Sequence, residues 1–230
     1  MHYIQDNISY IKNEIKDICR NIGRSPDEIR LIAVTKTINI DRINHSIMEG
    51  ITDIGENKVQ EILEKYDHIH DVKWHLIGHL QKNKVKYIID KVALIHSLDS
   101  ISLAQEINKR GQQHGIIMDV LVQVNVANEE TKFGIEAETV MDFIAELKSY
   151  PSIKVKGLMT IAPYEEEPEN VRIYFRKLKN IFDEIKTKDF SHIDMQFLSM
   201  GMTNDYRVAI EEGANMIRIG TGIFGARNYR

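Results

Sequence analysis

Cysteine is almost absent from this sequence: its 230 residues contain only Cys19, together with four prolines and one tryptophan. A single cysteine excludes an internal disulfide framework and is typical of proteins from reducing compartments. Long apolar runs are also missing, because no stretch approaches the roughly 20 residues that a membrane-spanning helix needs. The first residues, MHYIQD, lack the basic start and apolar core of a secretion signal. We therefore expect a cytoplasmic protein that is not associated with a membrane.

The sequence also lacks an excess of positive charge. It has 30 lysines and arginines against 34 aspartates and glutamates, which gives a formal net charge of -4. This balance provides no electrostatic footprint for nucleic acid. The apolar content of 43% and the charged content of 28% are ordinary for a globular protein. No low-complexity linker interrupts the chain, so we expect a single domain over residues 1–230.

The chain alternates between patterns typical of strands and of helices. Isoleucines spaced by four and three predict an amphipathic helix over residues 3–22, and Gly23 ends it. After it, short β-branched runs alternate with helical patterns. The predicted strands cover residues 31–36, 52–56, 72–78, 92–96, 118–125, 155–161, 194–199 and 216–219. The predicted helices between them cover residues 41–49, 57–66, 83–90, 100–114, 137–148, 168–186 and 204–212.

Eight strands, each followed by a helix except the last, match an α/β fold of the (β/α)8 TIM barrel type with an extra N-terminal helix. The alternative is a doubly wound open sheet. The even spacing of the eight units favours the closed barrel.

A lysine, Lys36, ends the first apolar strand. Barrels place their reactive groups at the carboxyl ends of strands. Partial burial there lowers the pKa of an amine, and a neutral amine can attack a carbonyl carbon. The simpler interpretation is a lysine that reaches from the strand end into solvent.

Glycines after the last strand indicate an anion site. Gly220, Gly222 and Gly225 fit G-x-G-x-x-G, but the further strand and acidic residue of a dinucleotide site do not follow. Glycine backbone and the hydroxyl of Thr221 can still approach a phosphate closely. The loop over residues 198–205 has a similar bias, and barrels commonly bind phosphate after strands seven and eight. An ordinary strand-to-helix turn is the alternative for this loop.

Histidines give no metal site. His75 and His79 lie four residues apart, but the segment between them is predicted as a strand end and contains no glutamate. His79 and Asn57 each follow a predicted strand and could line a pocket. Lys132 lies in the loop after the fifth strand, where a lysine is most often a solvated charge.

A lysine opposite an anion site suits a phosphorylated aldehyde, and pyridoxal phosphate fits this description. In an alternative barrel of the aldolase type, Lys36 would attack a sugar phosphate without any cofactor.

The sequence also resembles the pyridoxal phosphate homeostasis protein family, whose fold is similar to the amino-terminal barrel of alanine racemase. The resemblance runs nearly end to end. It is carried by the segments Ala33–Lys36, Gly55–Glu61, Trp74–Gln81, Gly157–Met159, Leu198–Met202 and Arg218–Arg227, which together are highly specific.

This resemblance implies a role for each candidate residue. Lys36 would carry pyridoxal 5'-phosphate as an internal aldimine, and Arg218 would approach the pyridine nitrogen. Asn57 and His79 would lie near the ring, and Lys132 would receive the cofactor transiently. The residues expected to hold the phosphate are Ser199, Gly201, Gly220 and Thr221. Met202 would lie close to the phosphate loop.

Two features argue for a carrier rather than an enzyme. Racemisation needs acid–base groups on both faces of the substrate α-carbon, and the racemase takes the second from a further domain for which this chain has no room. An arginine, with a pKa above about 12, also cannot protonate the ring nitrogen. We expect a non-catalytic, monomeric protein that buffers the cofactor and passes it transiently to apo-enzymes. A racemase-like enzyme is the alternative.

Overall fold

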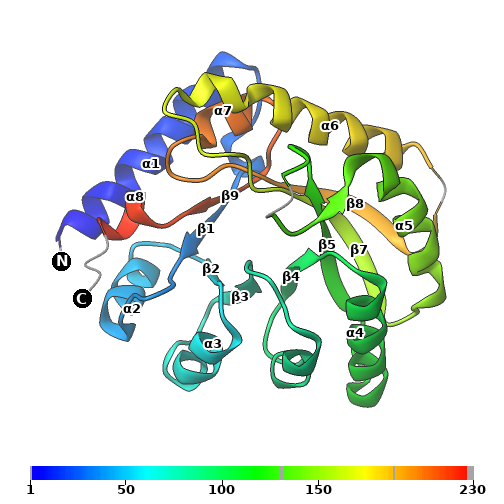
Figure 1. Cartoon of the computed structure of the whole chain (residues 1–230). Coiled ribbons are helices and arrows are strands. Elements are labelled where there is room, and N and C mark those ends of the chain that lie inside the picture. Colours follow the sequence, from blue (N-terminus) through cyan, green and yellow to red (C-terminus); the bar gives the residue numbers. More distant parts are fainter. Residues whose placement is uncertain (1, 130–131, 189, 227–230) are drawn as a thin grey trace.

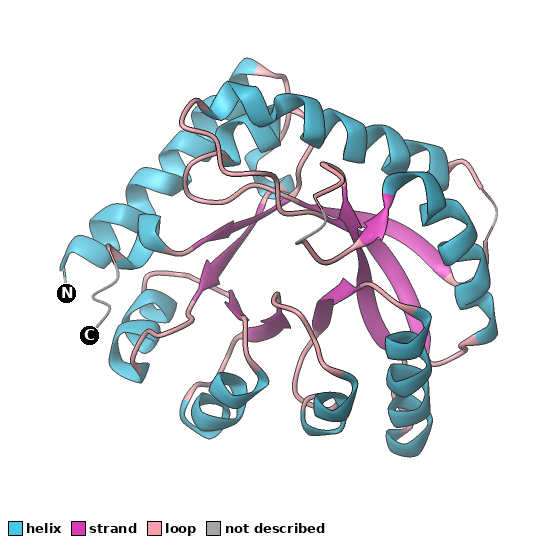
Figure 2. Cartoon of the chain, in the orientation of Figure 1, coloured by secondary structure: helices cyan, strands magenta, loops and turns pink. Residues whose placement is uncertain are grey.

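Parallel strands form a closed ring at the centre of the molecule (Figures 1 and 2). The computed structural model describes residues 2–129, 132–188 and 190–226. The strands of the ring are β1 (Arg30–Val34), β2 (Asp53–Glu56), β3 (Lys73–Leu76), β4 (Leu94–Leu98), β5 (Met118–Asn125), β7 (Ile153–Met159), β8 (Ile193–Ser199) and β9 (Met216–Ile219). Their order is β4-β3-β2-β1-β9-β8-β7-β5, and pairing of β4 with β5 closes the ring. The predicted (β/α)8 barrel is confirmed, and the open sheet is wrong.

Helices surround the ring on its outer side (Figure 2). They are α1 (His2–Asn21), α2 (Ile40–Met48), α3 (Val59–Lys65), α4 (Ile101–His114), α5 (Val140–Glu146), α6 (Arg172–Lys186), α7 (Tyr206–Glu211) and α8 (Thr221–Phe224). Short 3-10 segments cover Pro26–Glu28, Tyr66–His68, Lys82–Tyr87, Ala137–Thr139, Leu147–Ser149 and Pro168–Val171. In the described parts of the chain, no helix combines the length and the apolar character needed to cross a lipid bilayer.

Several predicted elements need correction. The helix expected over residues 83–90 is the 3-10 segment Lys82–Tyr87, and a 3-10 turn at Pro168 precedes α6. The sequence pattern also missed the two-residue strand β6 (Ile135–Glu136), which pairs with β5, and the single turn of α8. These elements are too short to produce a hydrophobic period, which is the signal on which the prediction depends.

The N-terminal helix α1 packs against the barrel through its stripe of isoleucines. The stripe is buried from Ile4 to Ile18, whereas Ile22 is partly exposed. Asn7 adds a side-chain bond from Nδ2 to the carbonyl of Ile223 in α8, at 3.0 Å. Gly23, with a φ of 70°, ends the helix as predicted. The helix therefore covers the side of the ring where the first and last strands meet.

The interior of the ring combines a small apolar cluster with polar side chains. The apolar members, from five different strands, are Ile32, Leu94, Leu121, Met159 and Met216. Buried among the strands are also His75, His96, Ser199 and Arg218. Buried polar groups need hydrogen-bond partners, so this interior requires a connected polar network.

One glycine allows two strands to approach closely. Gly157 has a φ of +152° at the irregular pairing of β7 with β8, and an added Cβ would lie 1.8 Å from the carbonyl oxygen of Phe197. Only glycine fits this position without moving one strand.

Candidate functional site

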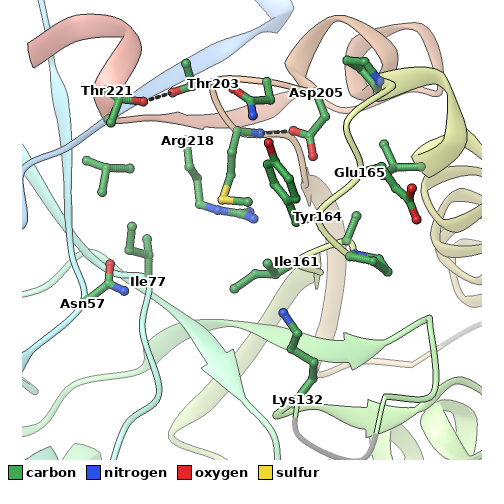
Figure 3. Close-up of a pocket in the computed structure, with 18 of the residues that line it drawn as sticks. Asn57, Ile77, Lys132, Ile161, Tyr164, Glu165, Thr203, Asp205, Arg218 and Thr221 are labelled. Carbon is green, nitrogen blue, oxygen red and sulfur yellow. Dashed lines mark hydrogen bonds between the residues drawn. The ribbon is translucent and has the colours of Figure 1, made fainter. Parts of the chain in front are cut away.

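A cavity of about 740 Å³ opens at the carboxyl ends of the strands (Figure 3). Small-molecule pockets commonly measure roughly 300 to 1,000 Å³. The cavity, called here the barrel-end pocket, lies at the end of the barrel where such folds place their functional groups. Its lining includes the predicted residues Lys36, Asn57, Lys132, Met202, Arg218, Gly220 and Thr221.

The lysine predicted to react, Lys36, follows β1 by two residues and is half-buried in the pocket wall. The next residue, Thr37, has a φ of 65°. This left-handed conformation is unfavourable for a β-branched residue and costs on the order of 1–3 kcal/mol. Surrounding contacts must therefore hold the backbone beside Lys36 in place.

A buried polar network supplies these contacts. Lys65 Nζ donates to Glu56 Oε1 at 2.7 Å, to the carbonyl of Thr35 at 2.9 Å and to Glu61 Oε2 at 3.0 Å. Thr35 Oγ1 also donates to Glu56 Oε1 at 2.7 Å, and the Thr37 N–H donates to Glu61 Oε2 at 2.6 Å. These five residues, called here the Lys65 network, fix the backbone on both sides of the pocket lysine.

The two carboxylates of the Lys65 network differ in environment. Glu56 is completely buried, and this burial raises the pKa of its carboxyl despite the opposing effect of Lys65. Burial also acts to raise the pKa of Glu61, but the hydrogen bonds from Thr37 and Lys65 outweigh it, and the pKa is lowered. Within the described residues Glu56 Oε2 has no hydrogen-bond partner, so the cation of Lys65 is the main compensation for the charge of Glu56.

Arg218 brings a buried cation to the pocket wall. Its Nη1 donates to Ser199 Oγ at 2.5 Å, and its Nη2 donates to the carbonyl of Thr160 at 2.7 Å. Burial lowers the pKa of Arg218 to about 10, although the carboxylate of Asp205 opposes this shift. The guanidinium nevertheless remains protonated at neutral pH, as expected.

The glycine-rich end of the pocket lies at the start of α8. Gly220 and Thr221 line the pocket there. Thr221 Oγ1 donates to Thr203 Oγ1 at 3.2 Å, a bond drawn in Figure 3, and Gly222 N–H donates to the same oxygen at 3.3 Å. Met202, from the loop after β8, lies beside them with an exposed fraction of 38%. Hydroxyls and glycine backbone thus meet at this end, as an anion site requires.

Two predicted phosphate residues lie behind the pocket. Ser199 is completely buried, and its Oγ contacts Arg218 and His96. Gly201 is also buried, and its carbonyl accepts the Arg218 N–H at 3.0 Å. An added Cβ on Gly201 would come within 2.6 Å of Ala209 Cβ. Neither residue is part of the pocket lining.

The two predicted ring neighbours, Asn57 and His79, line a second hollow together. Asn57 lines both the barrel-end pocket and this hollow, whereas His79 lines the hollow and is not among the residues that line the pocket. The His79 ring stacks on Phe133 with a centroid separation of 3.8 Å, and its Nδ1 bonds Asp99 Oδ2 at 3.2 Å. Lys132, next to Phe133, reaches the pocket itself (Figure 3).

Sequence reasoning missed part of the pocket wall. The loop after β7 contributes a segment of five residues, 161–165, and its Tyr164 has an exposed fraction of 79%. Thr203 and Asp205 add polar atoms from the loop over residues 198–205, which the sequence had already indicated. The general rule that loops after parallel strands form the site could have identified the first segment, because the sixth strand was predicted to end at Ile161.

Comparison with known proteins adds independent information. Residues 7–228 match the family model described as alanine racemase, N-terminal domain. The chain is 45% identical over 226 residues to the pyridoxal phosphate homeostasis protein of Aquifex aeolicus, covering 97% of this chain and 98% of the relative. The protein of the same name from Escherichia coli K12 is 34% identical over 234 residues, covering 100% of this chain and 99% of the relative.

A solved structure agrees with these matches. The structure of PipY from Synechococcus elongatus with PLP bound has a TM-score of 0.82 and 27% sequence identity to this chain. It covers 96% of this chain and 100% of that chain.

Proposed function

Because the chain belongs to the pyridoxal phosphate homeostasis protein family, we propose that it binds pyridoxal 5'-phosphate reversibly and takes part in the intracellular homeostasis of this vitamin B6 cofactor. The observation that carries the proposal is the composition of the barrel-end pocket. Lys36 follows β1, Arg218 lies in the neighbouring strand β9, and Thr221 follows β9; all three line one cavity. They provide an amine, a buried cation and an anion-binding end.

These residues fit the three polar parts of the cofactor. The amine of Lys36 would take the aldehyde, and Arg218 would donate to the ring nitrogen. Gly220 and Thr221 would hold the phosphate through backbone N–H groups and a hydroxyl. Ser199 and Gly201 would contribute from behind the pocket, because both hold Arg218 in place. Asn57, His79 and Met202 would border the ring and the phosphate loop.

Reversible attachment follows from the chemistry of an amine with an aldehyde. The nitrogen of Lys36 forms a double bond to the aldehyde carbon, and the aldehyde oxygen leaves as water. Hydrolysis reverses the step without an oxidant or a second substrate. The partly buried lysine therefore suits storage and release.

We also propose that this role involves no catalysis. It is supported by the homeostasis name of the relatives, which match this chain over nearly their whole length. It is also supported by Arg218, which remains protonated at neutral pH and therefore cannot hand a proton back and forth to the ring nitrogen as a carboxyl group can.

The competing function is a racemase-like enzyme that uses the same cofactor. Tyr164 favours it, because this tyrosine lies in the pocket wall and could supply a second acid–base group (Figure 3). Exchange of the α-hydrogen of alanine and other amino acids with solvent deuterium separates the two functions. Turnover at enzyme-like rates by the loaded protein would exclude the carrier role.

The attachment site can be tested directly. We expect borohydride reduction of the loaded protein, followed by peptide mass spectrometry, to find the cofactor on Lys36. Lys36→Ala should lose this mass and keep its circular dichroism spectrum, because one strand-end side chain contributes little to the core. Lys132→Ala is the matched control, since it removes a second pocket amine and should keep the mass on Lys36. A retained adduct in Lys36→Ala would contradict the assignment.

Delivery to apo-enzymes belongs to the same proposal, as do a monomeric state and a cytoplasmic location. Mixing the loaded protein with the apo form of a pyridoxal phosphate enzyme should restore activity faster than spontaneous release allows. Sedimentation of the purified chain should give the mass of one copy.

A further inference from the structure

A line of buried polar side chains crosses the interior of the barrel beneath Arg218. His75 Nε2 lies 2.8 Å from Asp53 Oδ1, and His75 Nδ1 lies 3.0 Å from His96 Nε2. His96 Nδ1 then lies 3.1 Å from Ser199 Oγ, which accepts from Arg218 Nη1 at 2.5 Å. These five residues, called here the histidine relay, belong to five different strands, β2, β3, β4, β8 and β9.

When both histidines are neutral, the chemistry of the two ends fixes the direction of every bond in the relay. A guanidinium can only donate and a carboxylate can only accept. Ser199 therefore accepts from Arg218 and gives its own hydrogen to His96 Nδ1. His96 must then carry its proton on Nε2 and donate to His75 Nδ1, and His75 donates from Nε2 to Asp53. One arrangement of protons satisfies the whole line, with both histidines neutral.

Burial favours this neutral arrangement. The exposed fractions of His75 and His96 are 1% and 0%. Burial lowers the pKa of both rings, and the charge of Arg218 lowers that of His96 further. At the other end, burial acts to raise the pKa of Asp53, but hydrogen bonds from His75 and Thr52 outweigh it, and the carboxyl remains ionised.

We infer that His75 and His96 are positioning residues for the cofactor, which hold Arg218 in its ring-facing place through Ser199. The inference rests on the proposed function. Without the relay, the hydroxyl of Ser199 could turn to another acceptor. Of its two bonds within the described residues, the guanidinium of Arg218 would then keep the one to the carbonyl of Thr160. With the relay, the hydroxyl oxygen is presented to the guanidinium in a single orientation. A merely structural role would instead require only that the polar groups be satisfied.

The first test uses the full chain without cofactor. Nitrogen-15 NMR of histidine-labelled protein should find His75 and His96 neutral at pH 7, each with its hydrogen on Nε2. The two resonances can be assigned by their loss in single histidine variants. A hydrogen on Nδ1 of either ring, or a charged ring, would overturn the inference without reference to the cofactor.

The second test uses pyridoxal phosphate as the probe. In His96→Leu, we expect the absorption maximum of the bound cofactor and its pH dependence to shift, and the affinity to fall about tenfold. In His96→Gln, the amide can donate to His75 and accept from Ser199, so the spectrum and most of the affinity should return. His192→Leu is the matched control, since His192 is a partly buried histidine outside the relay, whose Nε2 bonds the carbonyl of Ile144.

The outcomes separate the two proposals. If the unaltered protein shows no absorption band with pyridoxal phosphate, the proposed function fails, and the NMR result still decides the proton arrangement. If it binds but His96→Leu has the same spectrum and affinity, the positioning role is refuted. If His96→Leu does not fold, His96→Gln decides the question. A folded His96→Gln variant whose bound cofactor has an altered absorption spectrum would refute the positioning role.

Discussion

The Lys65 network makes a sharp prediction about stability beside the pocket lysine. Lys65→Met keeps the length of the side chain and removes its charge. Three hydrogen bonds to Glu56, Glu61 and Thr35 disappear with it. Glu56, which is completely buried and has one oxygen without a partner, then loses its only cation within bonding distance in the described parts of the chain.

The expected loss of stability depends on the charge of Glu56, which stays buried when Lys65 is replaced. Removing one partner of a buried ion pair typically costs 3–5 kcal/mol, because the remaining charge stays buried without compensation. We therefore expect Lys65→Met to lower the free energy of unfolding by about 4 kcal/mol. Adding Glu56→Gln removes the uncompensated charge, so the double variant should recover about 2 kcal/mol of this loss.

Urea denaturation followed by circular dichroism measures both quantities at pH 7. The matched control is Lys179→Met in α6, which removes an exposed partner of Asp183 one helical turn away. Such surface pairs contribute about 0.3–0.5 kcal/mol. The free energy of unfolding of the control should therefore be close to that of the unaltered protein.

A clear result would refute the reasoning. If Lys65→Met loses less than about 1 kcal/mol, or if the losses of the two single variants simply add in the double variant, Glu56 and Lys65 are not coupled through burial. If instead the prediction holds, Lys65→Met should also bind the cofactor more weakly, because the backbone on both sides of Lys36 is released.

Three further predictions concern the phosphate end, acid stability and the strand bulge. Thr221→Val should weaken cofactor retention by about 1–3 kcal/mol through loss of a hydroxyl bond to a charged group, as measured by equilibrium dialysis, and unchanged affinity would remove Thr221 from the site. Burial lowers the pKa of His75 and His96, so the unfolded chain binds more protons below about pH 6.5. The free energy of unfolding should therefore be constant above that pH. Below it, the free energy should fall by up to about 1.4 kcal/mol per pH unit for each histidine. A urea midpoint that stays the same from pH 7.5 to 5.5 would contradict this. Gly157→Ala should cost about 3 kcal/mol in thermal unfolding, because its Cβ would overlap the carbonyl of Phe197, and an unchanged midpoint would show that the strands separate easily.

The sequence predicted the elements with strong periodic signals. The isoleucines of α1 produce one buried stripe, and the β-branched runs of β1 and β5 are strands as expected. Errors gather at segments of one or two turns, such as α8 and Lys82–Tyr87. A segment of one turn has too few residues for its period to differ from chance, so its conformation depends on contacts made elsewhere.

The residues of the candidate site likewise fall into those that local sequence predicts and those that depend on tertiary contacts. Lys36 and Thr221 could be found because a strand end in a barrel is a location that local sequence reveals. Ser199 was placed with them by the family resemblance, yet its side chain points into the barrel interior and meets His96. Strand side chains alternate between two faces, so a shift of one residue decides whether a group faces the pocket or the interior.

The sequence alone determined the barrel, its N-terminal helix and the lysine at the end of β1, since each depends on periodicity or on resemblance along the chain. Tertiary structure alone decided the histidine relay and the Lys65 network. His75 and His79 were compared because they are four residues apart, but the bond that matters joins His75 to His96, 21 positions away. Closure of the ring brings these side chains together, and no local pattern records which residues will face one another across a closed barrel.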